Sequence, residues 1–384
     1  MEKCNVKGCG GCDLLHLPYE ETVKNKYNYV SKLFNEKKFN TKIEKIIPAK
    51  KHNQYRNKMI IAFQTQNGKI VHGFFQENSH RVMPMDKCLM HSDIQNNIAS
   101  YIKEIMIKLR LRPYDEDRKT GLIRYALIKH GFKSGEIMVV IITATEVFPG
   151  RSDFVKMLRA KFPEITTIIQ NINPRRTSIV LGEKERVLYG KGHITEFLEE
   201  FKFKISSKSF FQVNPEQTVN LYNTVLEFAD LKGKEVVLDA YSGVGTIGMF
   251  LSKKAKHIIS VESNKQAVNA AITNARDNNI KNISFVCDDA TNYIINLADA
   301  KEKLDVLVLD PPRSGSTPEF LNAALTLKPE KIIYVSCEPT TLVRDLGLLT
   351  KQYNISRVIL VDMFCWVDHV ETVVLMTKVD KYKL

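Results

Sequence analysis

The sequence predicts an α/β protein of two domains, a Rossmann-like domain over residues 204–384 preceded by an α+β domain over residues 1–203. Two observations support this prediction. After residue 204, short apolar runs alternate with segments of helical length, which is the pattern of an open parallel sheet. Before it, longer β-rich stretches occur between fewer helices, and most of the net positive charge of the chain lies there.

The Rossmann-like domain should contain seven strands. The last two are separated by only four residues, which are too few for a helical crossover. They should therefore pair as an antiparallel hairpin at the edge of the sheet. The expected strands span residues 235–241, 257–263, 283–289, 305–312, 331–337, 356–364 and 369–378.

The first domain combines β-rich stretches with a few helices. Residues 59–76 read as a hairpin, because Asn67-Gly68 is a favoured two-residue turn between alternating apolar positions. Residues 135–148 form a second β-rich stretch. Helices are expected at about 20–36, 92–110 and 151–162.

The positive charge is confined to the first domain. Residues 1–200 contain 34 Lys and Arg against 22 Asp and Glu, whereas residues 201–384 contain 22 against 21. Such an excess is typical of a surface that binds a polyanion, because neutralised phosphates release counterions. The first domain is therefore predicted to bind nucleic acid, with Arg56 and Lys58 as candidate contacts. A basic face that serves only solubility is the alternative.

Targeting signals are lacking in the sequence as it stands. No stretch approaches the roughly 18 consecutive apolar residues of a membrane span, and the first residues lack the apolar core of a signal peptide. We therefore expect a cytoplasmic protein without membrane contact, and a monomer.

Cysteines gather near the N-terminus. The chain has seven, an odd number that argues against a disulfide framework. Cys4, Cys9 and Cys12 are interspersed with glycines, which let a chain turn its N–H groups toward sulfur, and Cys88 supplies a fourth thiolate. The spacing predicts an iron–sulfur cluster in a lobe of about residues 1–90, and by itself it also fits the plant-type two-iron arrangement. A structural zinc ion and free thiols are the alternatives.

A glycine-rich turn follows the first strand of the Rossmann-like domain. The segment 237–248 passes from Asp239 through Gly243, Gly245 and Gly248 into a helix. Open α/β sheets bind cofactors at this edge, where glycine lets the backbone approach the ligand. Glu262, at the end of the second strand, is placed to accept hydrogen bonds from ribose hydroxyls. The pattern alone would equally suit a nicotinamide dinucleotide.

Two further strand ends carry reactive side chains. The fourth strand ends in Asp310, followed by two prolines that stiffen a loop suited to holding a planar base, and the fifth ends next to Cys337. Cys337 precedes a helix N-terminus, whose partial positive charge should favour the thiolate. The alternative is a small buried hydrophobe.

Such a thiolate could activate a uracil ring. Uracil C5 is too weak a nucleophile to attack a sulfonium methyl group, but addition of a thiolate at C6 creates an enolate that can. The adduct must then lose its C5 proton to a nearby carboxylate before the cysteine can leave. Glu371, at the start of the last strand, is the candidate base, and a surface carboxylate is the alternative for it.

Several motifs together resemble the RNA uracil-5-methyltransferase family, which methylates uridines of large-subunit ribosomal RNA and of tRNA. The resemblance rests on the cysteine pattern, YRNKM (55–59), SFFQVNPEQ (209–217), LDAYSGVGTIG (238–248), LDPPRSG (309–315), SCEPTTLVRDL (336–346) and HVETVVL (369–375).

The resemblance implies the activity and the site. It implies S-adenosylmethionine as methyl donor, RNA as partner, with 23S ribosomal RNA as the expected substrate and tRNA as the alternative, and a [4Fe-4S] cluster. The implied nucleophile is Cys337 and the implied base Glu371. The residues implied for the cofactor and target-base pocket are Gln212, Tyr241, Gly243, Glu262 and Asp310.

Three departures from the family pattern stand out. No small β-barrel RNA-binding domain precedes the cysteines, so the basic first domain should make more of the contacts to RNA. Glu338 replaces the usual asparagine after the cysteine, and its charge would oppose thiolate formation if it faced the sulfur. Residues 364–367 differ from the usual Phe-Pro-x-Thr, which affects the placement of Glu371.

Three other functions fit part of the pattern. A nicotinamide oxidoreductase with a ferredoxin-like module is compatible with both the glycine turn and the cysteines. A non-catalytic RNA chaperone would need only the basic domain. Methyl transfer from a folate with a flavin is disfavoured by the order of the expected strands and the glycine turn.

Overall fold

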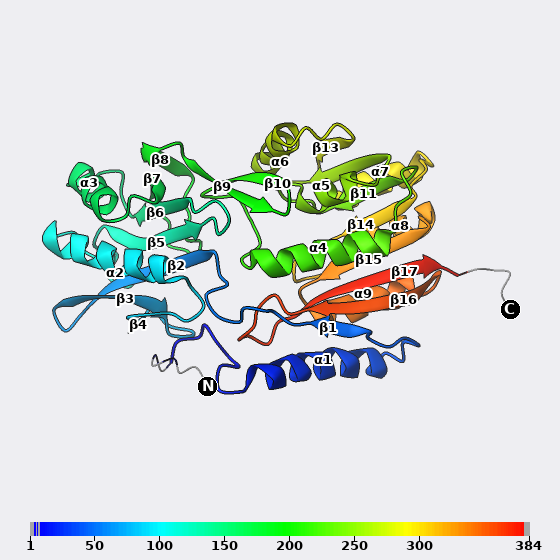
Figure 1. The fold of residues 1–384 in the computed structure, drawn as a ribbon, viewed down its shortest axis with the longest axis horizontal. Coiled ribbons are helices and arrows are strands. Elements are labelled where there is room, and N and C mark those ends of the chain that lie inside the picture. The colour runs from blue at the N-terminus through cyan, green and yellow to red at the C-terminus, as the bar shows by residue number, and fades with distance from the viewer. Residues whose placement is uncertain (1–3, 5, 7, 380–384) are drawn as a thin grey trace.

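The computed structural model describes residue 4, residue 6 and residues 8–379, which form two lobes (Figure 1). The N-terminal lobe is built on one sheet and the C-terminal lobe on another. A two-stranded hairpin, β9 (His193–Leu198) and β10 (Phe201–Ser206), lies between them. Its side chains Ile194 and Phe203 belong to a hydrophobic core that includes Ile169 of the first lobe and Phe250 of the second. The two lobes therefore share a core.

Within the described residues, the C-terminal sheet has eight strands in the order β1-β16-β17-β15-β14-β11-β12-β13. All strands are parallel to their neighbours except β17, which runs antiparallel to both β15 and β16. The seven expected strands are confirmed. They are β11 (Val236–Ala240), β12 (His257–Glu262), β13 (Ile283–Cys287), β14 (Val306–Leu309), β15 (Lys331–Ser336), β16 (Tyr353–Val361) and β17 (Glu371–Lys378).

The position of the last two strands differs from the expectation. They do form an antiparallel hairpin, but β17 is inserted between β15 and β16, and the short β1 (Lys45–Ile47) pairs with the outer side of β16. No local pattern indicates that an edge strand is added from a segment so distant along the chain. An antiparallel strand at this place also differs from the parallel strand order of a dinucleotide-binding fold, which argues against an oxidoreductase.

Helices cover both faces of the C-terminal sheet. Along β14, Val306 and Val308 point to one core and Leu307 and Leu309 to the other, because side chains alternate along a strand. The first core is closed by α4 (Pro215–Ala229) and α5 (Thr246–Ser252), and the second by α1 (Tyr19–Glu36), α7 (Ala290–Asp299), α8 (Pro318–Leu327) and α9 (Pro339–Leu349). Helix α6 (Lys265–Asp277) lies near β10 and β13.

The N-terminal sheet is mixed and has the strand order β4-β3-β2-β5-β6-β7-β8. The predicted hairpin is confirmed: Asn67 and Gly68, both with positive φ, connect the paired Gln66 and Lys69. Helices α2 (Asp93–Lys108) and α3 (Arg151–Lys161) cover one face. The strands are β2 (Lys58–Gln66), β3 (Lys69–Phe75), β4 (Val82–Pro84), β5 (Ile123–His130), β6 (Ile137–Thr143), β7 (Ile165–Ile172) and β8 (Lys184–Gly190).

The first segment of the chain packs on the C-terminal lobe. Helix α1 contributes Val30 and Phe34 to the core beneath α9, and β1 joins the sheet next to it. Residues 19–47 were expected to belong to the first domain, so the division at residue 203 needs this correction. An amphipathic helix shows that one face is buried, but it does not show against which partner.

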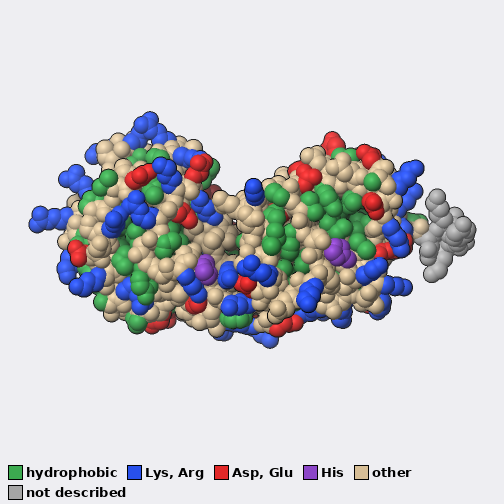
Figure 2. Space-filling model, turned by 90° about the horizontal axis from the view of Figure 1, so that it is seen from above, with side chains coloured by type: hydrophobic (Ala, Val, Ile, Leu, Met, Phe, Trp, Pro, Cys, Tyr) green, Lys and Arg blue, Asp and Glu red, His purple; other side chains and the backbone are tan. Residues whose placement is uncertain are grey.

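The surface view agrees with the charge distribution along the chain. Figure 2 shows Lys and Arg side chains over the N-terminal lobe and a hollow between the two lobes. Among the described residues, no helix is both long enough and apolar enough to cross a membrane.

Candidate active site

A cavity of about 710 Å³ lies at the carboxyl ends of the parallel strands of the C-terminal sheet. Strand ends β11, β12, β14 and β15 form one side, and the segment before α4 and the segment before β17 close the other. All seven residues expected in the cofactor and catalytic site line this single cavity: Gln212, Tyr241, Gly243, Glu262, Asp310, Cys337 and Glu371.

The glycine turn is shaped by its side-chain partners. Gly243 has a φ of 55° and donates its N–H to Glu262 Oε2 at 3.0 Å. Gly248 donates its N–H to Asp239 Oδ2 at 2.9 Å, and a Cβ at this position would lie 2.7 Å from Ser260 Oγ. Glu262 therefore anchors the turn at Gly243, on the cavity side, and Asp239 anchors it at Gly248, next to the strand.

Tyr241 forms the wall next to this turn. It adopts a left-handed backbone conformation, with a φ of 62°, which residues other than glycine seldom adopt. Its hydroxyl lies 3.1 Å from Ser316 Oγ, and its ring packs against Phe320 at 5.5 Å. Strain of this kind at a cavity wall is typical of functional sites, because the surrounding structure must enforce it.

The catalytic end of the cavity brings three acidic groups together. Burial raises the pKa of Cys337 to about 11, and the neighbouring Glu371 and Asp310 add to this, while Arg313 lowers it. Burial likewise raises the pKa of Glu371 to about 8 and that of Asp310 to about 7. The start of α9 was expected to favour the thiolate, but desolvation and the nearby carboxylates raise the pKa of Cys337 instead.

Glu338 does not act on the thiol. Its carboxylate caps α9, accepting the N–H of Thr340 at 3.2 Å and the Thr340 hydroxyl at 2.7 Å. The charged groups that shift the pKa of Cys337 are Glu371, Asp310 and Arg313. Because the Glu338 carboxylate caps α9, its charge does not oppose ionisation of the Cys337 thiol.

The unusual segment before Glu371 is anchored by α1. Lys26 donates to Asp362 Oδ1 at 2.6 Å and to the Phe364 carbonyl at 2.7 Å, and Tyr19 donates its hydroxyl to Asp362 Oδ2 at 2.7 Å. The side chains of Lys26 and Asp362 are only 1% and 0% exposed. This buried ion pair fixes the backbone from which Phe364 reaches the cavity.

The YRNKM segment braces two walls of the same cavity. Asn57 donates its side-chain N–H to the Gln212 carbonyl at 3.0 Å and its backbone N–H to Val213 at 2.9 Å. The Arg56 guanidinium lies 5.9 Å from the centre of the Phe364 ring. The sequence suggested Arg56 as an RNA contact, and the structure places it behind a wall of the active site.

Some cavity residues were missed from the sequence. Phe210 is 65% exposed beside the cavity, and Asp289 and Arg313 line it. Asp289 could have been found, because it follows the third strand at the edge where the other site residues lie. Phe210 offered no such signal, since a large exposed apolar side chain is visible only in the folded structure.

The four N-terminal cysteines lie near one another. The pKa of Cys12 is raised to about 12 by burial and by Cys88, Cys9 and Cys4, and that of Cys88 to about 11 by burial and by Cys9 and Cys4. Backbone N–H groups of Gly11 and of Met90 and His91 point to the sulfurs of Cys9 and Cys88. Within the described ranges, no three His, Cys, Asp or Glu side chains are arranged to hold a metal ion.

The fit to a metal centre depends on which centre is considered. A single tetrahedral zinc needs all sulfurs about 2.3 Å from one point, and the described residues do not provide that arrangement. An iron–sulfur cluster binds each thiolate to a different iron, so its sulfurs stand farther apart. Neighbouring thiols with N–H donors directed at sulfur suit the second case better.

Comparison with known proteins gives consistent matches over nearly the whole chain. The sequence profile described as tRNA (uracil-5-)-methyltransferase matches residues 18–379. A protein of Clostridium acetobutylicum described as an uncharacterized RNA methyltransferase is 40% identical, covering 98% of this chain and 84% of the relative. A protein of Clostridium tetani with the same description is 39% identical, covering 96% of this chain and 81% of the relative.

A solved structure is also similar over most of its length. The Pyrococcus abyssi tRNA (uracil-54, C5)-methyltransferase in complex with S-adenosyl-L-homocysteine has a TM-score of 0.81 and 26% identity. The match covers 97% of this chain and 86% of that structure.

Proposed function

Since the chain belongs to the tRNA (uracil-5-)-methyltransferase family, we propose that it transfers a methyl group from S-adenosylmethionine to C5 of a uridine in RNA. The observation that carries the proposal is the placement of Cys337, Glu371 and Asp310 at one end of a cavity whose other end is the glycine turn. A nucleophile, a base and a cofactor loop therefore open onto the same space.

Each residue has a role in this chemistry. Cys337 adds to C6 of the target uracil, so that C5 becomes nucleophilic. S-adenosylmethionine supplies the methyl group on a sulfonium, whose positive charge also favours ionised neighbours. Glu371 takes the C5 proton, after which the bond between C6 and Cys337 breaks and the product leaves.

The remaining cavity residues bind and orient the reactants. Glu262 is placed to accept hydrogen bonds from ribose hydroxyls, and Gly243 lets the backbone approach the cofactor. Tyr241 and Gln212 line the walls, and Asp310 lies close enough to Cys337 and Glu371 to raise the pKa of both. The raised pKa of Glu371, about 8, suits a group that must both hold and release a proton near neutrality.

Two replacements should fail at different steps. Cys337→Ala removes the nucleophile, so no covalent species can form. Glu371→Gln leaves addition and methyl transfer possible but removes the proton acceptor, which typically slows a step by about 10²–10⁴-fold. Denaturing gels should show a stable protein–RNA band for Glu371→Gln that is absent from Cys337→Ala and from the double variant.

Matched controls make this experiment decisive. Glu338→Gln removes a carboxylate next to the nucleophile that caps α9, and it should not trap an adduct. Asp368→Asn tests the other carboxylate near the base. Turnover at the parent rate by Glu371→Gln, or an equal band for Asp368→Asn, would contradict the role given to Glu371.

The substrate we propose is 23S ribosomal RNA, with tRNA as the second candidate. The cysteine pattern supports the first, because it resembles the branch of the family that acts on ribosomal RNA. The similar Pyrococcus abyssi enzyme is described as acting on tRNA, which keeps the second open. Mapping 5-methyluridine in both RNAs from a deletion strain distinguishes them.

We also infer that Cys4, Cys9, Cys12 and Cys88 hold a [4Fe-4S] cluster with a structural role. None of the four lines the active-site cavity. Anaerobically purified protein should contain iron and sulfide and absorb near 400 nm. The Cys88→Ser variant should lack the iron, the sulfide and the absorption. Stoichiometric zinc without iron would contradict this inference.

A further inference from the structure

A second cavity, of about 580 Å³, lies in the N-terminal lobe. Aromatic side chains form its floor: Phe75, Tyr114 and Tyr125 line it, and the rings of Phe75 and Tyr125 meet edge to face at 6.0 Å. Two cations, Lys119 and Arg176, line its rim and are exposed. We name this cavity the aromatic groove.

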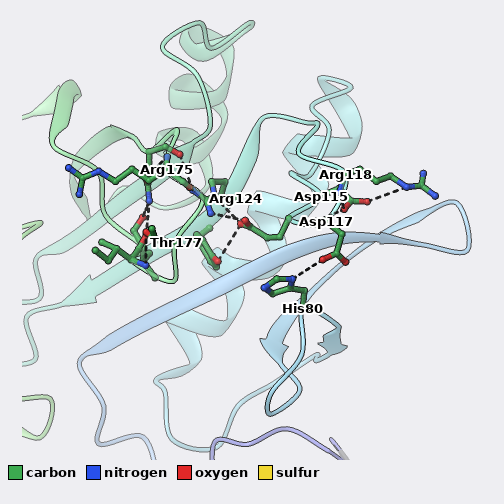
Figure 3. Close-up of polar contacts among 12 residues, drawn as sticks. His80, Asp115, Asp117, Arg118, Arg124, Arg175 and Thr177 are labelled. Carbon is green, nitrogen blue, oxygen red and sulfur yellow. Dashed lines mark hydrogen bonds and ion pairs between the residues drawn. The ribbon is translucent and has the colours of Figure 1, made fainter.

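The walls of the aromatic groove are two loops joined by one buried cation. Arg124 is 3% exposed and donates from Nε and from a terminal nitrogen to Glu116, at 2.9 and 2.7 Å. Its other terminal nitrogen donates to the carbonyls of Asn173 and Arg175, at 3.0 and 2.7 Å. Figure 3 shows Arg124 at this junction. The loops 112–121 and 173–180 are thus held in place before any ligand arrives.

The acidic side chains around the groove already have partners. Asp115 accepts the N–H groups of Asp117 and Arg118, and Asp117 lies 2.9 Å from His80 (Figure 3). Glu116 is bound by Arg124. Within the part of the chain that the structure describes, neither Lys119 nor Arg176 forms an ion pair. These two cations therefore remain available to an anion.

The groove lies on the sheet face that leads to the active site. Tyr125 and Lys129 are on the same face of β5, because side chains alternate along a strand, and α2 and α3 cover the opposite face. Lys129 donates to the carbonyls of Ser206 and Ser209, next to the cavity-lining Phe210. Tyr125 and Lys129, four residues apart on β5, are separated by about 13 Å, so the groove and the contact of Lys129 with Ser209 lie along one face of the sheet.

We propose that the aromatic groove binds an unpaired nucleotide of the RNA substrate, with its base against Phe75 and Tyr125 and its phosphate near Lys119 and Arg176. The identity of the ligand rests on the proposed function. Aromatic rings stack on any base, and nearby cations neutralise the backbone, which is the usual composition of a single-strand site. An acidic peptide would use the cations but would leave the rings without a flat partner.

Binding variants test this site directly. They are made in the full chain carrying Cys337→Ala, so that no covalent step contributes, and the probe is an oligouridylate of about 20 nucleotides. Phe75→Ala should weaken binding by about 5- to 150-fold, as expected for loss of one stacked base, and Phe75→Tyr, which keeps a ring, should restore it. Arg176→Glu should reduce the slope of log affinity against log salt by about 0.7.

A control variant and a cross-link locate the RNA. Lys156→Glu changes an exposed cation of α3, on the other side of the sheet, and should bind as the parent does. An oligouridylate with 4-thiouridine should cross-link to peptides of the groove in the parent and lose those cross-links in Arg176→Glu. Equal affinity and slope for all variants, or cross-links only elsewhere, would overturn the proposal.

The two proposals can fail separately. If the active-site assignment is wrong, Glu371→Gln will trap no adduct, while the groove variants will still weaken oligouridylate binding. If the groove assignment is wrong, Glu371→Gln will trap the adduct equally well with and without Arg176→Glu.

Discussion

The buried pair of Lys26 and Asp362 offers the sharpest test of how the two ends of the chain hold each other. The charged atoms of the two side chains are 2.6 Å apart, and both side chains are almost fully buried. In Lys26→Met, Asp362 keeps the Tyr19 hydroxyl as its remaining side-chain donor. Breaking a buried pair from one side typically costs about 3–5 kcal/mol. We expect the free energy of unfolding to fall by that amount in Lys26→Met, and similarly in Asp362→Asn.

The double variant decides whether the loss comes from an uncompensated charge. Lys26→Met with Asp362→Asn removes both charges and keeps an oxygen that can accept from Tyr19, so its stability should be no lower than that of either single variant. Denaturant midpoints measured on all four proteins give the coupling energy. Lys32→Met, in an exposed pair with Glu36 on the same helix, should change stability by less than about 1 kcal/mol. Additive losses in the double variant would refute the reasoning.

Three further predictions concern the active site. The folded-state pKa values of Asp310 and Glu371, about 7 and 8, lie above their ordinary values of 3.8 and 4.5. Their stabilising contribution is therefore complete only below those ordinary values and is lost as pH rises toward 8, by at most about 1.4 kcal/mol per pH unit for each group. Denaturation at several pH values should show this loss, with a flatter profile for Glu371→Gln, and a profile unchanged by that replacement would contradict it. The value of kcat/KM should rise with pH between 6 and 9, because the thiolate of Cys337 and the carboxylate of Glu371 are both required; a flat single-turnover profile would argue against these roles. Gly248→Ala places a Cβ 2.9 Å from Asp239 Oδ2 and should weaken cofactor binding measured by calorimetry, whereas Gly347→Ala, which meets nothing within 4 Å, should not.

Much of the active site could be predicted because several of its residues follow a general rule of parallel sheets. Side chains that follow parallel strands meet at the carboxyl edge of the sheet, so Glu262, Asp310 and Cys337 had to lie close together once their strands were identified. Gln212 and Glu371 come from segments outside that rule. The need for a base at C5 pointed to Glu371, whereas Gln212 was found only through the motif resemblance.

The remainder depends on contacts that no local pattern records. The edge position of β1 and the docking of α1 join residues more than 300 positions apart, as in the hydrogen bond from Arg357 to Glu44. The protonated state expected for Cys337 depends on burial and on two carboxylates from other strands. The loops that form the aromatic groove are set by a single buried arginine, which a sequence shows only as one more positive charge.

The addition of β1 and α1 to the C-terminal sheet has a consequence for synthesis on the ribosome. Glu44 leaves the ribosome 313 residues before its partner Arg357, which corresponds to about 15 to 60 s at usual translation rates. During that time β16, the partner of β1, is still incomplete, and β17, which lies between β16 and β15, is the last of the described strands to be made. The C-terminal sheet can therefore be completed only late in synthesis, and until then part of the apolar face of α1 stays uncovered.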